Sequence, residues 1–488
     1  MKKIISITFI VSLLLMSCKK DFIAKTPVST ISVDALYKTD KDFQDAVIGI
    51  YFGFRDPYQN FWQFGDVRAD DVQHDPASGL EQIRTDNFVT DNSDNLLASS
   101  WRSYYIIINR ANVLLSKIKT ADVAIVKNKE RHKAEAQFLR ALAYFNLVRI
   151  FGDVPLLTAP ITSEEAYKIG REKVDKIYTD LIIKDLVEAE NNLPVKYTGT
   201  DVGRATKGAA KALLGKVYLT RKDFVKAEAK LQEVTTLGYA LLNNFNDLFD
   251  YTKDEHHSEY IYDIEYISGG FGLGSGFTNA FTLEFQFGGK PLVDELFRRF
   301  HIPPGAGGSA GNPTAAFRAA FDPKDLRKDI TAVTGLTGPT GVFIPLSPTG
   351  VSAFTMKYMA PIIANGDSPA NWKVIRYADV LLMYAEALNE NGKTTEALTF
   401  LNLVHKRAGL SAYASLPQNE TREKIYLERR FELFLEGHRW FDLVRTGRAL
   451  SIMSSKGMKP YMTIFPIPLN QIELINDRSV FSQNPGYE

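Results

Sequence analysis

Residues 429–447, "RRFELFLEGHRWFDLVRTG", gather carboxylates, guanidinium groups and one imidazole within a short stretch of chain. Such groups could cleave a glycosidic bond if two carboxylates stood on opposite sides of it, about 5–9 Å apart. Glu432 and Glu436, however, are four residues apart on one predicted helix, so they share a face and do not flank a cleft. We therefore expect the segment to be structural, with Glu432 paired with Arg429.

The apolar residues of the same segment support this interpretation. They form a stripe at helical spacing, which predicts a helix over Glu420–Glu436 with that stripe against the core. A second helical piece is predicted over His438–Arg445, with Trp440 on its apolar side. Asp442 then lies three residues from an arginine on either side, and we expect it to pair with Arg439 or Arg445.

Two further motifs suggest cofactor or metal chemistry only superficially. Gly305–Ala310 fits the dinucleotide fingerprint, but two prolines precede it where a strand is required, and Asn312-Pro313 blocks the helix that should follow. His256-His257 has glutamates nearby, but neighbouring side chains point in different directions and the spacing of a zinc motif is missing. We expect no cofactor, no metal and no catalytic activity.

Sugar binding requires other groups, namely an exposed aromatic ring for the apolar sugar face and polar side chains for the hydroxyls. Residues 60–75, "NFWQFGDVRADDVQHD", supply both, with Trp62 as the ring and Asp66, Asp70 and Asp71 as acceptors. A second interpretation is that Trp62 closes the core while the acids cap the loop. The sequence leaves both interpretations open.

Two other aromatic residues are candidate ligand contacts. Phe271 lies among glycines in "GGFGLGSGF", where a mobile ring could close over a ligand. Trp372 follows a glycine- and proline-rich region and precedes a predicted helix. We interpret Arg376 as a structural residue that pairs within the helix layer, and Trp101 as a core residue on a helix face.

The elements that must position these residues are mainly helices. Helical periodicity predicts helices over Asp40–Phe54, Leu96–Ile118, Lys129–Phe151, Lys173–Asn191, Lys207–Thr220, Phe224–Leu237, Ile375–Asn391, Thr395–Arg407 and Glu420–Glu436. Alternation over Tyr260–Ile267 predicts a strand. Arg55–Asn95 and the glycine- and proline-rich Ser268–Ser352 are expected to form long irregular loops, which often carry function.

Two predicted helix pairs fit the tetratricopeptide pattern. In these pairs, small residues let antiparallel helices approach and larger ones fill the groove between them. The residues that carry the pattern are Leu214, Gly215, Tyr218, Ala227 and Leu231 in the first pair, and Ala385, Leu388, Ala397 and Leu401 in the second. Each pair leaves an apolar face open, so several pairs must stack.

The N-terminus has the features of a secretory signal. Lys2 and Lys3 precede an apolar run, Ile4–Met16, that is too short to span a bilayer. The run closes as Leu-Met-Ser-Cys, which resembles the lipobox of bacterial lipoproteins and implies cleavage before Cys18 with acylation of that residue. A plain signal peptide with an incidental cysteine is the alternative. Since Cys18 is the only cysteine, we expect no disulfide and no cysteine metal site.

The charge balance argues against nucleic-acid binding. The chain of 488 residues has 58 basic and 57 acidic residues, and removal of Lys2 and Lys3 leaves a net charge near −1. The length is ample for one large core or two intimately packed halves.

Several segments in order resemble the SusD/RagB family. They are "KKDF" after the lipobox, "WRSYYIIINRANVLL", "AEAQFLRALAYFNLVRIFGDVPL", "IRYADVLLMYAEALNE", "ERRFELFLEGHRWFDLVR" and "IFPIPLNQIELINDRSVFSQNPGY". The resemblance runs from Cys18 to the C-terminus. It implies a mostly α fold, with a tetratricopeptide-like scaffold of helix pairs, long irregular loops and a few short strands.

That resemblance further implies a signal peptide over 1–17 and one domain over 18–488, in which a part of about 18–230 packs against a part of about 260–488. It implies a non-catalytic lipoprotein on the outer face of the outer membrane. Such a protein would cap a SusC-like TonB-dependent transporter, bind oligosaccharides or polysaccharides and deliver them for import. Three alternatives stay open: a peptide-binding relative, a periplasm-facing repeat scaffold for other proteins, and a glycoside hydrolase.

Overall fold

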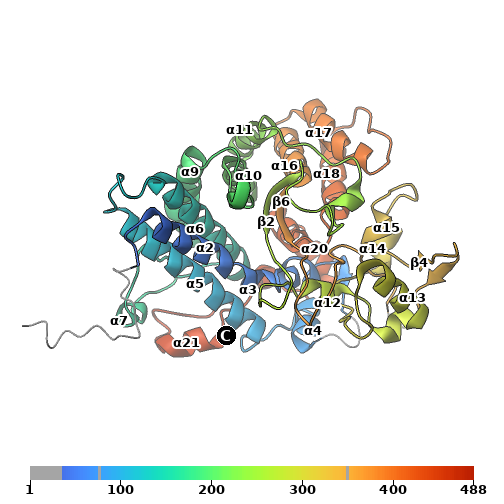
Figure 1. The fold of residues 1–488 in the computed structure, drawn as a ribbon, viewed down its shortest axis with the longest axis horizontal. Coiled ribbons are helices and arrows are strands. Elements are labelled where there is room, and N and C mark those ends of the chain that lie inside the picture. Colours follow the sequence, from blue (N-terminus) through green and yellow to red (C-terminus); the bar gives the residue numbers. More distant parts are fainter. Residues whose placement is uncertain (1–35, 75–78, 348–350) are drawn as a thin grey trace, which may run out of the picture.

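The computed structural model describes residues 36–74, 79–347 and 351–488 of the chain. The predicted signal peptide, 1–17, and Cys18 lie outside these ranges. Helices make up nearly all of one half of the molecule, and the other half combines helices with the strands and most of the long loops (Figure 1).

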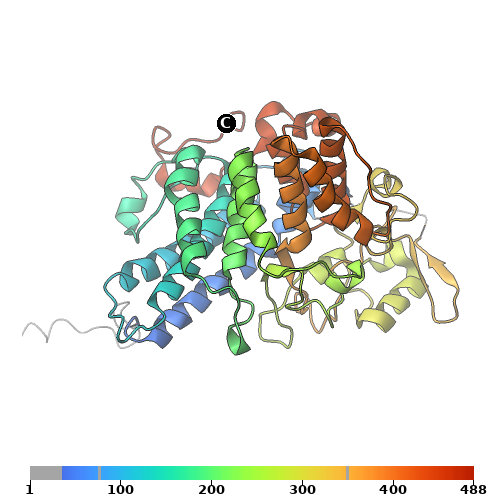
Figure 2. The ribbon, with the colours of Figure 1, turned by 90° about the horizontal axis from the view of Figure 1, so that it is seen from above.

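The helical half begins with four long helices that lie side by side (Figures 1 and 2). They are α2 (Asp40–Gly53), α5 (Asn95–Ile118), α6 (Lys129–Phe151) and α9 (Ile183–Asn192). The predicted helix over Lys173–Asn191 is divided into α8 (Val174–Ile177), a π-helical turn, η4 (Tyr178–Ile182), and α9. The other predicted helices lie within a few residues of their expected bounds.

The two predicted repeat pairs are antiparallel helix pairs in the structure. They are α10 (Lys207–Thr220) with α11 (Phe224–Thr235), and α16 (Tyr377–Glu390) with α17 (Thr394–Arg407). Gly215 permits the close approach in the first pair, because a Cβ at this position would lie 2.6 Å from the Leu231 side chain. Asp223 caps α11 by accepting a hydrogen bond from the N–H of Lys226 at 3.2 Å. This confirms the mostly α, repeat-like fold.

The regions expected to be irregular contain more short elements than predicted. Within 55–95 they are α3 (Arg55–Tyr58), the π-helical turn η3 (Gln63–Val67) and α4 (Leu80–Asp86). Within 268–352 they are α12 (Phe277–Phe281), α13 (Phe285–Phe300), α14 (Ala315–Ala319) and α15 (Lys328–Thr331). The strands form three two-stranded antiparallel ladders: β1 (Val72–Gln73) with β3 (Asn312–Pro313), β2 (Tyr260–Ile264) with β6 (Trp372–Arg376), and β4 (Gly335–Thr337) with β5 (Phe343–Pro345).

The remaining elements are distributed over both halves. They are α7 (Ser163–Ala166), η5 (Gly199–Asp201), η6 (Phe245–Leu248), α18 (Gln418–Glu432), α19 (Arg439–Arg445), α20 (Ala449–Met453), η7 (Ser454–Lys456), η8 (Pro460–Thr463) and α21 (Leu469–Ile475). The C-terminal segment returns to the N-terminal helices (Figures 1 and 2). There the N–H of Phe465 donates to the carbonyl of Ile150 at 2.7 Å, and the amide of Asn484 donates to the carbonyl of Phe151 at 2.9 Å.

A continuous hydrophobic core joins residues from both halves, from Phe43 on α2 to Phe481 near the C-terminus. A smaller satellite core lies under α13 and β4. None of the helices within the described ranges is long and apolar enough to cross a membrane.

Candidate functional site

The charged segment 429–447 lies in the interior and forms what we call the buried charge network. Its members are Lys216, Arg327, Lys357, Arg376, Asp379, Glu386, Arg407, Arg429, Glu432, Glu436, His438, Asp442 and Arg445. Glu432 accepts hydrogen bonds from Arg376 at 2.5 Å and Arg327 at 3.0 Å, and it also pairs with Arg407. The expected pair of Glu432 with Arg429 is therefore wrong.

Arg429 is instead held by two aspartates. It donates to Asp379 at 2.8 Å and to Asp442 at 2.9 Å. Asp442 also accepts a hydrogen bond from Arg445 at 2.8 Å, which confirms one of the two partners expected for it. The helix α18 ends at Glu432 and not at Glu436, so the chain turns early and directs both glutamates toward Arg376.

The electrostatics of this network favour stability over catalysis. Burial alone would raise the pKa of Glu432, but the guanidinium groups of Arg407, Arg376 and Arg327 outweigh it and lower the pKa far below its usual value. Burial, followed by the nearby Lys216 ammonium, lowers the pKa of His438 to about 3. Two cavities beside His438 measure about 20 Å³ each, which leaves room for roughly one water molecule and none for a substrate.

The two tryptophans expected at the ligand are in the core. Trp62 is 2% exposed, donates its indole N–H to the carbonyl of Gln59 at 3.1 Å and meets the ring of Phe281 edge to face. Trp372 is fully buried on β6 and stacks on Tyr358 at 5.3 Å. This corrects the expectation that they present ring faces to a ligand, because neither ring reaches the surface. Trp440 and Trp101 are buried, as predicted.

The three acids of residues 60–75 also have internal partners. Asp66 is buried and accepts a hydrogen bond from the N–H of Gly437 at 2.7 Å, while Asp70 accepts one from Arg439 at 2.8 Å. Asp71, also buried, accepts one from Arg430 at 2.7 Å. The expectation that these acids face a sugar is thereby corrected, because they attach this early segment to residues 430–439.

The contact between these two segments is unusually close. A Cβ added at Gly65 would lie 2.4 Å from the Cα of Gly437, and Gly437 itself has a positive φ of 79°. Both positions therefore require glycine, one for the approach of two backbones and the other for backbone conformation as well. Residues 65 and 437 thus form a fixed joint between the early segment and the end of the chain.

Phe271 is the one aromatic candidate on the surface, with 70% of its area exposed. It occupies the tip of a turn that Gly270 and Gly272 allow by adopting positive φ angles of 78° and 68°. The carboxylate of Asp367 accepts hydrogen bonds from the N–H groups of Gly269 at 3.2 Å and Gly270 at 2.8 Å. The turn is therefore anchored at its base while the ring projects into solvent.

Asp367, which holds the base of this turn, follows the loop 362–365, and that loop lines a cavity of about 590 Å³, which we call the loop cavity. Its lining comes from Asn279 and Ala280 on α12 and from the loops 303–308 and 362–365. Asn279 connects the two loops, because its amide donates to the carbonyl of Ala306 at 2.9 Å and its oxygen accepts from the N–H of Gly366 at 3.0 Å. The loop cavity therefore offers mainly backbone polar groups and small apolar side chains.

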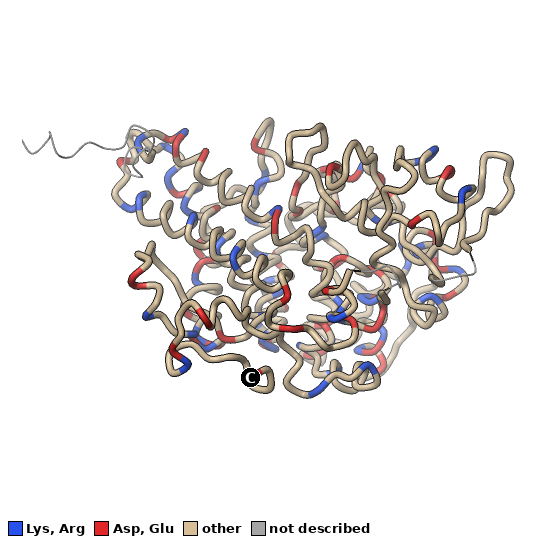
Figure 3. Tube along the Cα trace, turned by 90° about the horizontal axis from the view of Figure 1, so that it is seen from below, with Lys and Arg blue, Asp and Glu red and all other residues tan. Residues whose placement is uncertain are grey.

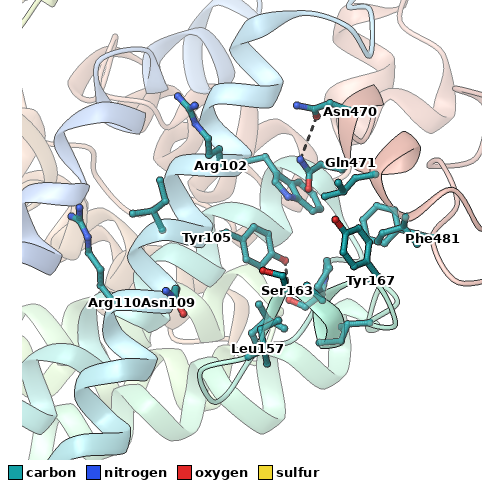
Figure 4. A pocket seen from close by; sticks show the side chains of 18 residues that line it. Arg102, Tyr105, Asn109, Arg110, Leu157, Ser163, Tyr167, Asn470, Gln471 and Phe481 are labelled. Carbon is teal, nitrogen blue, oxygen red and sulfur yellow. Dashed lines mark hydrogen bonds between the residues drawn. The ribbon is translucent and has the colours of Figure 1, made fainter. Parts of the chain in front are cut away.

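A second hollow, the helical groove, lies between α5, α7 and α21 and measures about 580 Å³ (Figure 4). Tyr105 of α5 and Tyr167, which follows α7, extend into it, and Tyr167 is 49% exposed. Arg102, Asn109 and Gln471 also line it. The hydroxyl of Tyr105 donates to the carbonyl of Pro155 at 2.8 Å, which fixes the position of its ring.

The sequence alone does not predict the helical groove, because its walls come from three separate segments, 101–110, 155–169 and 470–481. The first and the last of these segments are more than 300 residues apart. One signal was present in the sequence. Ile106 lies on the outward face of α5 together with Arg102 and Asn109, and it is 43% exposed. A large apolar residue on a polar helix face indicates a surface that is hollowed or covered.

The histidine pair makes no metal cluster. His256 contacts Glu265 at 2.7 Å, and the N–H of Glu259 donates to Nδ1 of His257 at 3.1 Å. Across residues 36–74, 79–347 and 351–488, no group of three or more His, Cys, Asp or Glu side chains is arranged to hold a metal ion.

Comparison with known proteins gives consistent matches. The profile described as "SusD family" matches residues 351–463, and the profile described as "Starch-binding associating with outer membrane" matches residues 29–219. The chain is 29% identical to SusD-like protein P2 of Formosa agariphila, over 99% of both chains. It is 25% identical to the starch-binding protein SusD of Bacteroides thetaiotaomicron, over 73% of both.

Solved structures agree with these matches. A laminarin-binding SusD-like protein has a TM-score of 0.76 and 30% identity, with 92% of this chain and 100% of that chain covered. Surface glycan-binding protein A from Bacteroides thetaiotaomicron, in complex with laminarihexaose, has a TM-score of 0.77 at 21% identity, with 92% and 100% covered. This second likeness concerns the fold alone.

Proposed function

This chain belongs to the SusD family, and we propose that it is a non-catalytic glycan-binding lipoprotein of the bacterial cell surface. In this proposal, acylated Cys18 anchors the protein in the outer membrane, facing the exterior. The protein caps a SusC-like TonB-dependent transporter and delivers bound oligosaccharides for import.

The observation that carries the proposal is the likeness to a laminarin-binding protein at 30% identity over nearly the whole chain. The profile that matches residues 29–219 adds starch binding and association with the outer membrane. The buried charge network supports a non-catalytic role, because its carboxylates are held by arginines and lysines in the interior.

We assign glycan binding to Phe271 and the loop cavity, which are connected through the segment 362–367. A pyranose has an apolar C–H face that packs against an aromatic ring, and Phe271 presents such a ring on an anchored turn. The cavity volume of about 590 Å³ lies in the range of roughly 300–1,000 Å³ typical of ligand sites. Backbone groups of residues 303–308 and 362–365 can bond sugar hydroxyls.

The test is calorimetric titration of the purified mature protein with laminarin oligosaccharides, starch oligosaccharides and a set of peptides. We expect glycan binding that weakens about tenfold or more in Phe271→Ala, which removes the stacking surface. Phe343→Ala is the matched control, because Phe343 is 54% exposed on a different hairpin. Binding of peptides without glycans, or equal binding by Phe271→Ala and wild type, would contradict the assignment.

Anchoring and orientation need a separate experiment in cells. Cys18→Ala should remove lipid labelling and release the protein from the outer-membrane fraction, since a multiply acylated terminus is a stable anchor. Protease treatment of intact cells should degrade the wild-type protein. Protection until lysis would favour a periplasm-facing scaffold. Co-purification with a barrel transporter tests the proposed partner.

A further inference from the structure

The helical groove differs from the loop cavity in that its lining is positively charged. Two of its lining residues are arginines, Arg102 and Arg110, and none is an aspartate or glutamate. The side chain of Arg102 is exposed and makes no hydrogen bond or ion pair with any residue that the structure describes. Arg110 donates one N–H to the carbonyl of Gly49 at 2.7 Å, which leaves most of its five donors available.

Acidic residues close to the groove are directed elsewhere. Glu164 on α7 pairs with Lys168 at 3.1 Å, and Glu165 accepts a hydrogen bond from the N–H of Thr162 at 2.7 Å. Glu473 is exposed on α21 but does not line the groove. Figure 3 shows basic and acidic positions mixed along the chain, so the charge of the groove is local and not part of a broad basic face.

Between the two arginines the groove offers apolar and aromatic surface. Arg102 and Arg110 are eight residues apart on α5, about 12 Å along the helix axis, and Tyr105 and Ile106 lie between them. Tyr167 supplies a second ring from the other side (Figure 4). A ligand that matches this order carries separated anionic groups with apolar faces in between.

Amide side chains complete the lining. Asn109, Asn470 and Gln471 line the groove, and Gln471 donates to the side-chain oxygen of Asn470 at 3.4 Å. Amides both donate and accept hydrogen bonds, which suits hydroxyl groups. Every residue of an acidic sugar chain carries hydroxyl groups for these amides, whereas the side chains of an acidic peptide carry carboxylates, so the lining matches an acidic sugar chain better.

We propose that the helical groove is a second carbohydrate site, selective for oligosaccharides that carry carboxylate or sulfate groups. Arg102 and Arg110 bind the anions through planar, bidentate hydrogen bonds, while Tyr105 and Tyr167 pack against the sugar faces. The volume of about 580 Å³ accommodates a short oligosaccharide. The site stands independently of the loop cavity, because the two are lined by different residues.

The experiment uses the full mature protein and three probes: a trisaccharide of uronic acids, a sulfated trisaccharide and neutral laminaritriose. Binding is measured by calorimetry for wild type, Arg102→Glu, Tyr167→Ala and Phe271→Ala. Lys119→Glu is the charge-matched control, because Lys119 is an exposed cation at the end of the same helix and does not line the groove. Thermal unfolding verifies that all variants are folded.

We expect at least one acidic probe to bind wild type, and both Arg102→Glu and Tyr167→Ala to weaken it by about tenfold or more. Lys119→Glu should leave that binding unchanged, because Lys119 does not line the groove. The relative affinities of the two acidic probes identify which anion the site prefers. The proposal is overturned if neither acidic probe binds wild type, if Lys119→Glu weakens binding as much as Arg102→Glu, or if an acidic peptide displaces the probe at lower concentration.

The neutral and acidic probes distinguish failure of this proposal from failure of the proposed function, because each probe tests a different site. Loss of neutral glycan binding in Phe271→Ala supports the loop cavity whatever the groove does. If no neutral or acidic carbohydrate binds, both assignments fail together.

Discussion

The buried charge network and the helical groove contain arginines, aromatic rings and polar groups, but in opposite circumstances. Arg376 is 1% exposed and is held by Glu259, Glu432 and Glu436, whereas Arg102 is exposed without a partner among the described residues. The segment 429–447 has the highest density of charged side chains, but these side chains already have partners inside the protein and are not available to a ligand. What a charged side chain can do depends on whether the fold has already supplied its partner.

Substitution of Arg376 should have the largest effect. Arg376→Met leaves three carboxylates in the interior without their shared guanidinium, and the free energy of unfolding should fall by about 3–5 kcal/mol. Urea denaturation measures the change. Arg102→Met is the matched control and should stay within about 0.5 kcal/mol of wild type. Similar losses in both variants would remove the distinction between the two regions.

Trp440 provides an apolar test of the same region. The side chain is fully buried, and the Trp440→Ala variant should lose about 3–4 kcal/mol by leaving a cavity. Its glycan affinity, measured below the unfolding transition, should remain that of wild type. Intact stability with lost binding would instead place Trp440 at a ligand.

Acid should weaken the network through His438. Because its folded pKa is lowered to about 3 from 6.5, the folded state favours the neutral ring, and stability is full above pH 6.5 and falls as pH drops toward 3. This group alone should cost about 1 kcal/mol between pH 7.5 and 5.5. Denaturation at both pH values, for wild type and His438→Gln, isolates the effect. An equal pH dependence in the two proteins would exclude His438 as its source.

A small effect on global stability is also expected on the loop side. Asn279→Ala removes the connection between the loops 303–308 and 362–366 and should lower stability by only about 1–2 kcal/mol, because few core contacts depend on it. Hydrogen exchange at the Gly366 amide should accelerate, and glycan affinity should fall. Unchanged exchange would show that the loops are held independently of Asn279.

Local patterns were sufficient to predict the scaffold. The bounds of α6 (Lys129–Phe151) and α10 (Lys207–Thr220) match the prediction, because the apolar residues of a long helix recur at helical spacing in the sequence itself. The repeat pairs were predicted for the same reason. The outward position of Phe271 also follows local information, since the flanking glycines form the turn.

The positions of the other candidate residues depend on packing between segments that are far apart in the sequence. Trp372 was expected near the surface, but pairing of β6 with β2 directs it inward against Tyr358. Trp62 is closed in by α12, whose Phe281 comes from a region expected to be irregular. The acids Asp70 and Asp71 meet arginines more than 350 residues away, and no pattern within residues 60–75 could indicate those partners.

The glycine joint between residues 65 and 437 determines when the early segment can finish folding. During synthesis, Asp66, Asp70 and Asp71 emerge long before Gly437, Arg439 and Arg430, which hold them in the finished protein. Until roughly the last eighth of the chain, residues 430–488, is available, this segment lacks these partners. A chain truncated before residue 430 therefore lacks the groups that hold Asp66, Asp70 and Asp71, and we expect this segment not to reach its native packing in such a chain.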